Sequence, residues 1–198
     1  MTNHKKYLER KALFKSFGYD VDKERLFIIK SALPIKGRIL EAGTGKGHFA
    51  INLAKKGYHF TTFDVSKKEQ KYARLNLRYF DLNHYADFRI ENAEYLSFKD
   101  NSYDTIFCVN TIHHFKNAYK VLDELIRVIS EEGQIILSDF TKEGFKVVEK
   151  IHRLEGGLHK AGKVTLSEAG KYMRKKGFRI KKSSSRFQEV IAAHRNKI

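Results

Sequence analysis

The chain has 198 residues and a mass of 23.1 kDa, the size of a single domain. Hydrophobic residues make up 41% of it and charged residues 31%, which permits a buried core and excludes broad disorder. No segment approaches the roughly 20 apolar residues that cross a bilayer, and the first residues lack the apolar run of a secretion signal. We therefore expect a soluble, cytoplasmic protein.

Basic residues are concentrated at the two ends of the sequence. The formal net charge is +16, and residues 1–40 contribute +6, residues 41–140 contribute −1, and residues 141–198 contribute +11. Basic flanks of this kind attract polyanions or acidic substrates. A solvated, lysine-rich surface has the same composition, so nucleic acid is an alternative partner that the sequence does not favour.

The N-terminal segment predicts helix. An apolar helical stretch at 26–33 precedes the only proline, Pro34, and the residue before a proline is disfavoured in the α region. Residues 1–36 are therefore expected to form a short helical cap. The next expected elements are a strand at 37–42, a helix at about 46–56 and a strand at 59–64.

Ser66 and Glu69 have the spacing of a capping box and predict the start of the next helix. Its expected buried face carries Tyr72, Leu75, Tyr79 and Leu82. Further along, the expected elements are strands at 88–90, 103–109 and 133–139, and a helix from about Asn117 that buries Ala118, Val121, Leu122, Leu125 and Val128. Alternating strands and helices of this length predict a parallel sheet covered on both faces.

The C-terminal part departs from this alternation. Thr165 and Glu168 predict a capped helix that ends at Gly177. The β-like runs at 178–184 and 187–194 are joined by a turn too short for a crossover, so they must be antiparallel. The predicted fold class is α/β, a Rossmann-like doubly wound mixed sheet in three α/β/α layers, with an antiparallel C-terminal hairpin.

The clearest chemical feature follows the first strand, where residues 41–47 read Glu-Ala-Gly-Thr-Gly-Lys-Gly. Glycines at alternate positions let the backbone turn tightly and approach a ligand. A dinucleotide site needs its third glycine at position 48, which is His48, and no Gly-Lys-Ser/Thr of a phosphate-binding loop is present. Glu41 favours a cationic amino-acid end over an anionic pyrophosphate. Asp64, at the end of the second strand, can accept hydrogen bonds from both hydroxyls of a ribose.

In these segments the sequence resembles the class I S-adenosylmethionine-dependent methyltransferases, and specifically the small type that includes quinone-biosynthesis enzymes. The segments that carry the resemblance are 39–47, 63–66, 92–98, 103–106 and 111–115. The resemblance covers about residues 37–140 by motif and the C-terminal hairpin by topology. It implies a seven-stranded sheet whose last strand is antiparallel, and S-adenosyl-L-methionine as cofactor.

The resemblance also implies a set of cofactor-binding residues: Glu41, Gly43, Thr44, Gly45, Gly47, Asp64, Val65, Asn92, Ala93 and Asn110. Glu41 and the glycine backbone would lie near the methionine part, Asp64 on the ribose and Val65 on the adenine face. Asn92 stands where the family commonly has aspartate, and its amide oxygen can accept the same hydrogen bond. Asn110 resembles the position whose backbone approaches the cofactor amine.

No catalytic residue is assigned by the sequence, because methyl transfer from a sulfonium depends mainly on positioning. His113 and His114 are candidates to act as a base or to orient a substrate, and they can equally be the entry to the next helix. The lone cysteine, Cys108, lies in an apolar strand and is expected to be a buried thiol rather than a nucleophile. The amino-methylating nucleic-acid enzymes of this fold are set aside because residues 110–113 contain no proline.

A metal site is not predicted. His152, Glu155 and His159 fall on one stripe of a helix, but the glycines at 156 and 157 interrupt that helix before His159. The stripe is better interpreted as a polar helix face or as part of a lid.

These observations together predict an S-adenosylmethionine-dependent methyltransferase that acts on a small molecule. Its cap would be residues 1–36 and its methyltransferase domain residues 37–198, with a lid-like insertion at 141–164. Two alternatives stay open: an RNA or protein methyltransferase that docks through the basic flanks, and a non-catalytic cofactor-binding protein.

Overall fold

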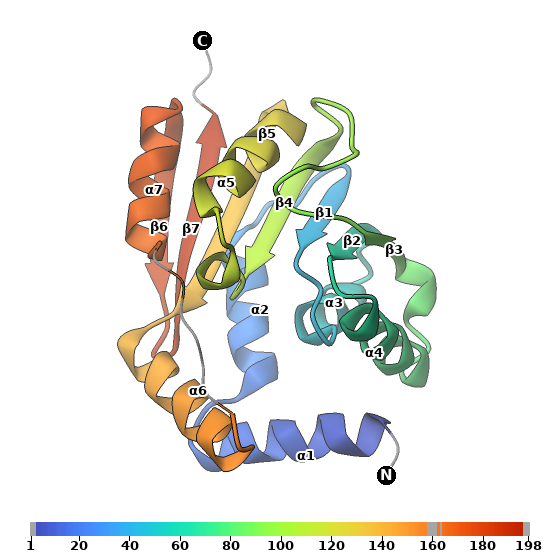
Figure 1. The fold of residues 1–198 in the computed structure, drawn as a ribbon. Helices are drawn as coiled ribbons and strands as arrows, with labels where there is room; N and C mark the ends of the chain where they lie inside the picture. Colours follow the sequence, from blue (N-terminus) through green and yellow to red (C-terminus); the bar gives the residue numbers. More distant parts are fainter. Residues whose placement is uncertain (1–2, 158–161, 163, 196–198) are drawn as a thin grey trace.

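A seven-stranded sheet runs through the molecule in the order β3-β2-β1-β4-β5-β7-β6 (Figure 1). The computed structural model describes residues 3–157, 162 and 164–195. The strands are β1 (Ile39–Ala42), β2 (Phe60–Asp64), β3 (Ala86–Ile90), β4 (Tyr103–Val109), β5 (Ile129–Phe140), β6 (Phe178–Ser184) and β7 (Gln188–Arg195). The first five are parallel, and β7 pairs antiparallel with both β5 and β6. The predicted fold class is confirmed.

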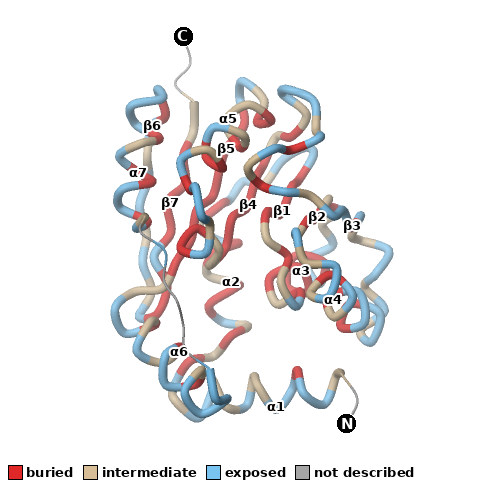
Figure 2. The backbone as a smooth tube through the Cα atoms, in the orientation of Figure 1, coloured by how far each residue is buried: buried red, intermediate tan, exposed pale blue. Residues whose placement is uncertain are grey.

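Helices cover both faces of the sheet (Figure 1). The helices are α1 (Asn3–Ser16), α2 (Val21–Ser31), α3 (His48–Ala54), α4 (Lys67–Tyr79), α5 (Ala118–Val128), α6 (Lys142–Leu154) and α7 (Leu166–Lys175), with short 3-10 turns η1 (Asn83–Tyr85) and η2 (Ile112–His114). Buried side chains of α5 and α7 join one apolar cluster, and those of α2, α3 and α4 join another. Figure 2 shows the buried segments following the strands and the inner sides of these helices.

Helix α2 is part of the main core. Ile28 is fully buried and Ile29 is 3% exposed, and both belong to the cluster that contains Ile136 of β5 and Val190 of β7. Asp20 begins the helix by accepting hydrogen bonds from the N–H groups at positions 22 and 23. The helix therefore contributes to the layer that covers the sheet, although it precedes the first strand.

Several sequence predictions are confirmed at residue level. Helix α5 buries the five apolar residues that its periodicity assigned to the core, and β4 spans 103–109 as predicted. Thr165 and Glu168 form the predicted capping box of α7, with both reciprocal hydrogen bonds present. Strand β5 is longer than predicted, because pairing with β4 starts at Ile129.

The predicted buried face of α4 is wrong. Leu75 is 41% exposed and Tyr79 is 62% exposed. The residues of α4 that are buried are Gln70, Ala73, Asn76 and Leu77. This face turns inward because α4 packs against the loop after β1, where small and polar side chains fit the close approach of two backbones.

Helix α1 crosses the edge of the sheet where the parallel strands end, and it reaches from α4 to α6 (Figure 1). Tyr7 is the only residue of this helix that is buried. Polar contacts hold α1 at both ends: Asn3 Nδ2 donates to Asn76 Oδ1 on α4 at 2.7 Å, and Arg10 pairs with Glu155, just after α6, at 2.6 Å. None of the helices in the described ranges is long and apolar enough to cross a membrane.

The packing of α2 generates a stability prediction. Ile28→Ala should lower the free energy of unfolding by about 3 kcal/mol, because it removes a fully buried side chain from a closed core. Leu33→Ala is the matched control, since Leu33 is 57% exposed just beyond the same helix. Urea unfolding measures both changes. Equal, small effects would show that α2 is a loosely attached appendage.

Candidate active site

The loop after β1 is tied to the neighbouring strand. The N–H groups of Gly43 and Thr44 donate to Phe63 O at 2.9 and 3.0 Å. Gly47 has φ +82°, and a Cβ there would lie 3.2 Å from Ala73 of α4, so close packing of the helix requires glycine. Gly45 has φ +51°, and a Cβ added there would have no atom of another part of the protein within 4 Å. The loop therefore packs against α4 at one glycine and faces open space at another.

Asp64 fixes the outer part of this loop. Its Oδ2 accepts from Gly45 N at 2.9 Å, and its Oδ1 accepts from Ser66 N at 2.9 Å. Ser66 caps α4 by accepting from Glu69 N at 3.2 Å, as predicted. The predicted capping box is nevertheless incomplete, because the Ser66 N–H is bound by Asp64 rather than by Glu69. A carboxylate has about four acceptor sites, so Asp64 retains capacity for further donors.

A chain of buried polar side chains lies beneath the loop. Thr62 Oγ1 donates to Glu41 Oε2 at 2.6 Å, and the hydroxyls of Thr44 and Thr62 lie 2.6 Å apart. Gln70 Nε2 then donates to Thr44 Oγ1 at 2.9 Å. Because the Thr62 hydroxyl donates to Glu41, the Thr44 hydroxyl must donate to Thr62. All hydrogen bonds of the chain are therefore donated in the direction from Gln70 towards the Glu41 carboxyl group. Sequence reasoning missed Thr62 and Gln70, because a polar residue in a strand or helix does not by itself reveal which way it faces.

Burial governs the protonation of Glu41. This residue is 1% exposed, and burial raises its pKa from the usual 4.5 to about 8, against smaller opposing effects of the Thr62 hydrogen bond and the charge of Arg25. The carboxyl is therefore mostly protonated at pH 7 in the ligand-free protein. A cation brought close to it would favour the ionised form.

A cavity of about 210 Å³ opens on one side of the loop. Five of the predicted cofactor-binding residues line it together: Gly43, Asp64, Val65, Asn92 and Ala93. Val65 is 71% exposed beside the Asp64 carboxylate, which places an apolar side chain and a hydrogen-bond acceptor next to each other. Asn92 Oδ1 accepts from Glu94 N at 3.0 Å and keeps a second lone pair for another donor. The donor and acceptor set and the apolar wall fit a nucleoside.

A second cavity, of about 270 Å³, borders the loop at Gly45 and Lys46. Its apolar and aromatic lining comes from Phe14, Tyr19, Val21, Phe140 and Val148, and its polar lining includes Arg10, Arg25, Gly45, Lys46, His48, Glu69, Asn110, His114 and His152. Of the predicted residues, Gly45 and Asn110 line this cavity rather than the first. Asn110 has φ +53°, and its N–H donates to Ser138 O at 2.8 Å.

The two candidate histidines have different surroundings. His113 is 3% exposed, and its Nδ1 lies 2.7 and 2.8 Å from the two carboxylate oxygens of Asp139, which is itself buried. His114 is exposed and lines both cavities. His113 is therefore held by a buried carboxylate, whereas His114 borders both cavities.

Other candidate groups are accounted for by packing. Cys108 is 1% exposed, and burial raises the pKa of its thiol to about 12, which confirms a buried thiol. Glu155 pairs with Arg10, and His159 lies outside the described residues. Within the described part of the chain, no group of three or more His, Cys, Asp or Glu side chains has the arrangement of a metal site.

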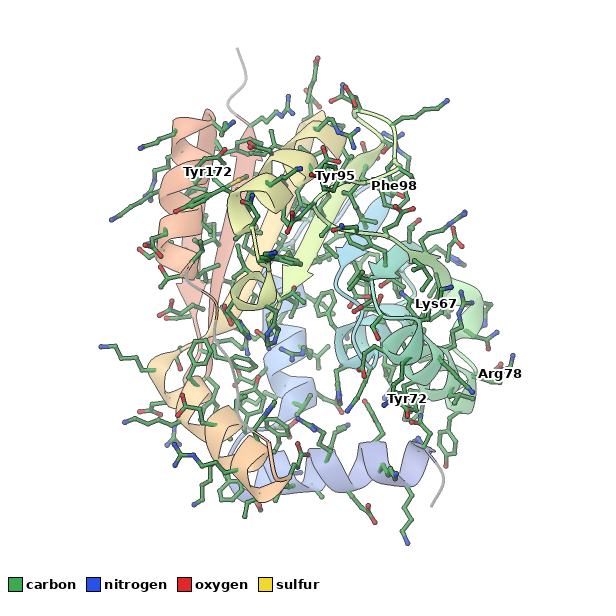
Figure 3. The ribbon with its side chains drawn as sticks, viewed as in Figure 1. Lys67, Tyr72, Arg78, Tyr95, Phe98 and Tyr172 are labelled. Carbon is green, nitrogen blue, oxygen red and sulfur yellow. The ribbon has the colours of Figure 1, made fainter. Side chains whose placement is uncertain are left out.

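Among the described residues after 141, no lysine or arginine lines either cavity. On α7, Tyr172, which is labelled in Figure 3, donates from its Oη to Asp123 of α5 at 2.8 Å. Lys176, just after the helix, pairs with Asp123 at 2.8 Å. Tyr172, which lies among Lys171, Arg174 and Lys175 of α7, is thus engaged with a carboxylate.

Comparison with known proteins identifies the fold and the type of domain. Residues 40–137, about half of the chain, match the family model described as a methyltransferase domain. The ubiquinone/menaquinone biosynthesis C-methyltransferase of Rickettsia prowazekii (strain Madrid E) is 26% identical over 174 residues, covering 79% of this chain and 70% of that protein.

Solved structures have the same architecture. The PH0226 protein from Pyrococcus horikoshii OT3 aligns with a TM-score of 0.72 at 15% identity, over 96% of this chain and 92% of that one. Magnesium protoporphyrin IX methyltransferase from Synechocystis PCC 6803, solved with bound S-adenosylhomocysteine, aligns with a TM-score of 0.63 at 23% identity, over 89% and 82%.

The buried carboxyl group predicts a pH effect on stability. Because the pKa of Glu41 is raised on folding, the stability that its neutral form contributes is fully present below about pH 4.5 and declines as the pH rises through about 8. Glu41→Gln, which cannot ionise, should flatten the stability profile over this range. Urea unfolding at several pH values checks it, and an unchanged slope would contradict the raised pKa.

The position of Asp64 predicts a role in ligand affinity. Asp64→Ala should weaken binding of S-adenosylhomocysteine at least tenfold, about 1.4 kcal/mol, because charge-assisted hydrogen bonds are lost and the Gly45 N–H loses its acceptor. Asp87→Ala, which removes an exposed carboxylate of adjacent strand β3, is the control. Calorimetry gives both affinities. Equal affinities in the folded Asp64→Ala and Asp87→Ala variants would show that Asp64 only holds the loop and does not bind the ligand.

Proposed function

Because the chain belongs to the S-adenosylmethionine-dependent methyltransferases, we propose that it methylates a small molecule held in the 270 Å³ cavity. The observation that carries this proposal is the position of that cavity. It adjoins the glycine loop at Gly45 and Lys46, shares His114 with the nucleoside-sized cavity, and is lined by residues of α1, α2 and α6. A cavity of this volume, lined by three helices, suits a small acceptor better than a folded RNA or protein. Its aromatic lining favours an acceptor with an apolar or aromatic body.

The cofactor would be held mainly by residues of the first cavity and the loop. Asp64 is expected to accept from the ribose hydroxyls, Val65 to cover one face of the adenine and Asn92 to bind its edge. The bound cofactor supplies a methyl group activated on a sulfonium. The protonated amino group at its other end would find Glu41 and the backbone near Asn110, and ionisation of Glu41 would then match that positive charge.

The protein's part in the reaction is placement of the acceptor and exclusion of water. Positioning alone supplies a large share of the rate of a bimolecular transfer when the reacting atoms are held in contact. A base is needed only for an acceptor that is protonated at the working pH. His114 borders both cavities and is the residue we propose for that role, while the pair of His113 and Asp139 holds the 3-10 turn that carries it.

Cofactor choice and turnover are tested together. We expect calorimetry to detect binding of S-adenosylmethionine and not of NAD, because His48 occupies the position of the third dinucleotide glycine. Cofactor labelled in its methyl group, supplied with a panel of small phenols, quinols and amines, should yield a labelled product. Tighter binding of NAD would refute the cofactor assignment. Cofactor binding with no product from any acceptor class would favour a non-catalytic binding protein.

The role of His114 has its own test. With an acceptor found in the panel, His114→Gln should lower kcat about a hundredfold while the affinity for S-adenosylhomocysteine stays within twofold. His84→Gln on η1, which lines neither cavity, is the control. An unchanged kcat in His114→Gln would show that transfer proceeds by positioning alone.

A further inference from the structure

A third and larger cavity, of about 840 Å³, lies beside the proposed acceptor cavity. Its walls come from α1, the glycine loop, the start of α3, α4 and the residue after α6. Four residues line both this space and the 270 Å³ cavity: Arg10, Lys46, His48 and Glu69. The two spaces therefore adjoin, and we call the larger one the α1–α4 cavity.

Three lysines from three different elements line the α1–α4 cavity. They are Lys6 of α1, Lys46 of the glycine loop and Lys68 of α4, and each is exposed. In the part of the chain that the structure describes, none of the three forms an ion pair with a carboxylate. Each ammonium group therefore keeps its three N–H donors available for a ligand.

The carboxylates of the same cavity do not balance this charge. Glu155 is already paired with Arg10 at 2.6 Å. The other two, Glu9 and Glu69, stand against three lysines. The cavity therefore carries an excess of positive charge that the protein itself leaves uncompensated.

His48 lies where the α1–α4 cavity meets the acceptor cavity, and it indicates a positive potential there. Its ring stacks on Tyr7 of α1, with the centroids 4.9 Å apart. Burial lowers the pKa of His48 to about 3, and the charges of four nearby cations, Arg10 and Lys46 among them, lower it further. Among the described residues its buried Nδ1 has no hydrogen-bond partner. An anionic ligand in this position would match the potential and offer a partner to that nitrogen.

We propose that the α1–α4 cavity binds a phosphate group of the methyl acceptor, whose apolar body lies in the adjoining 270 Å³ cavity; this inference rests on the function proposed above. A phosphate monoester carries a charge near −2 at neutral pH and three acceptor oxygens, which suits three separate ammonium groups. The hydroxyl of Tyr72, which lies between α4 and α1 (Figure 3), is a further neutral donor in the same wall.

The test uses a probe that joins an aromatic ring to a phosphate through three carbons. Calorimetry compares 3-phenylpropyl phosphate with 3-phenylpropanol, its uncharged counterpart, on protein saturated with S-adenosylhomocysteine. The wild type should bind the phosphate about tenfold more tightly than the alcohol. Added KCl should reduce this preference, because exposed lysines are screened by salt.

Two triple variants with the same change in net charge separate the cavity from the overall field of the protein. Lys6→Gln/Lys46→Gln/Lys68→Gln removes the three lysines of the cavity, and the preference for the phosphate should fall to within about twofold. The control, Lys56→Gln/Lys67→Gln/Lys71→Gln, removes exposed lysines that line neither cavity and should keep the preference. All six side chains are exposed, so both variants should fold.

Three results would overturn the proposal: no binding of the phosphate probe, no preference for it over the alcohol in the wild type, or an equal loss of preference in both triple variants. Inorganic phosphate tests the link between the two cavities, and binding as tight as that of the aromatic phosphate would show a free anion site instead of a part of the acceptor site. Failure of the wild type to bind any S-adenosyl ligand would refute the proposed function, and the same probes on the ligand-free protein would still test the cavity.

Discussion

The hydrogen bonds that fix the loop between β1 and α3 determine the geometry of everything around it. Asp64 holds the loop from outside through Gly45 N, and the chain from Gln70 through Thr44 and Thr62 to Glu41 holds it from beneath. Ordering a glycine-rich loop has a large cost in backbone conformational entropy, which these hydrogen bonds help to offset. Anchoring by neighbouring strands and a helix keeps the backbone fixed while one side of it stays open to ligand.

The inward face of α4 follows from that constraint. Because the helix must approach the loop closely, its buried positions are Ala73 and Leu77 opposite Gly47 and the polar residues Gln70 and Asn76, which bond to loop atoms. Larger apolar residues are displaced outwards, and Tyr72 lies in the space between α4 and α1 (Figure 3). Close packing against the loop therefore leaves Leu75 and Tyr79 on the outer face of α4.

The second cavity depends on elements far apart in the sequence. Helices α1 and α2 come from the N-terminus and α6 from the segment after β5, and they meet at the edge where the parallel strands end. Each brings a different chemistry: aromatic residues, the buried cation Arg25, and the ion pair between Arg10 and Glu155 that joins α1 to the end of α6. The nucleoside-sized cavity, by contrast, is built from the strand ends and loops of the sheet.

The sequence alone determined the succession of strands and helices along the chain and the antiparallel hairpin, because periodicity and turn length are local properties. Five residues that the family resemblance implied as cofactor-binding line the first cavity together. Only the tertiary structure decided which face of α4 is buried, that Arg25 is buried at the wall of the second cavity and that His113 pairs with Asp139. Those facts depend on contacts between elements tens of residues apart. Local patterns do not encode the identity of the neighbour that a side chain meets after folding.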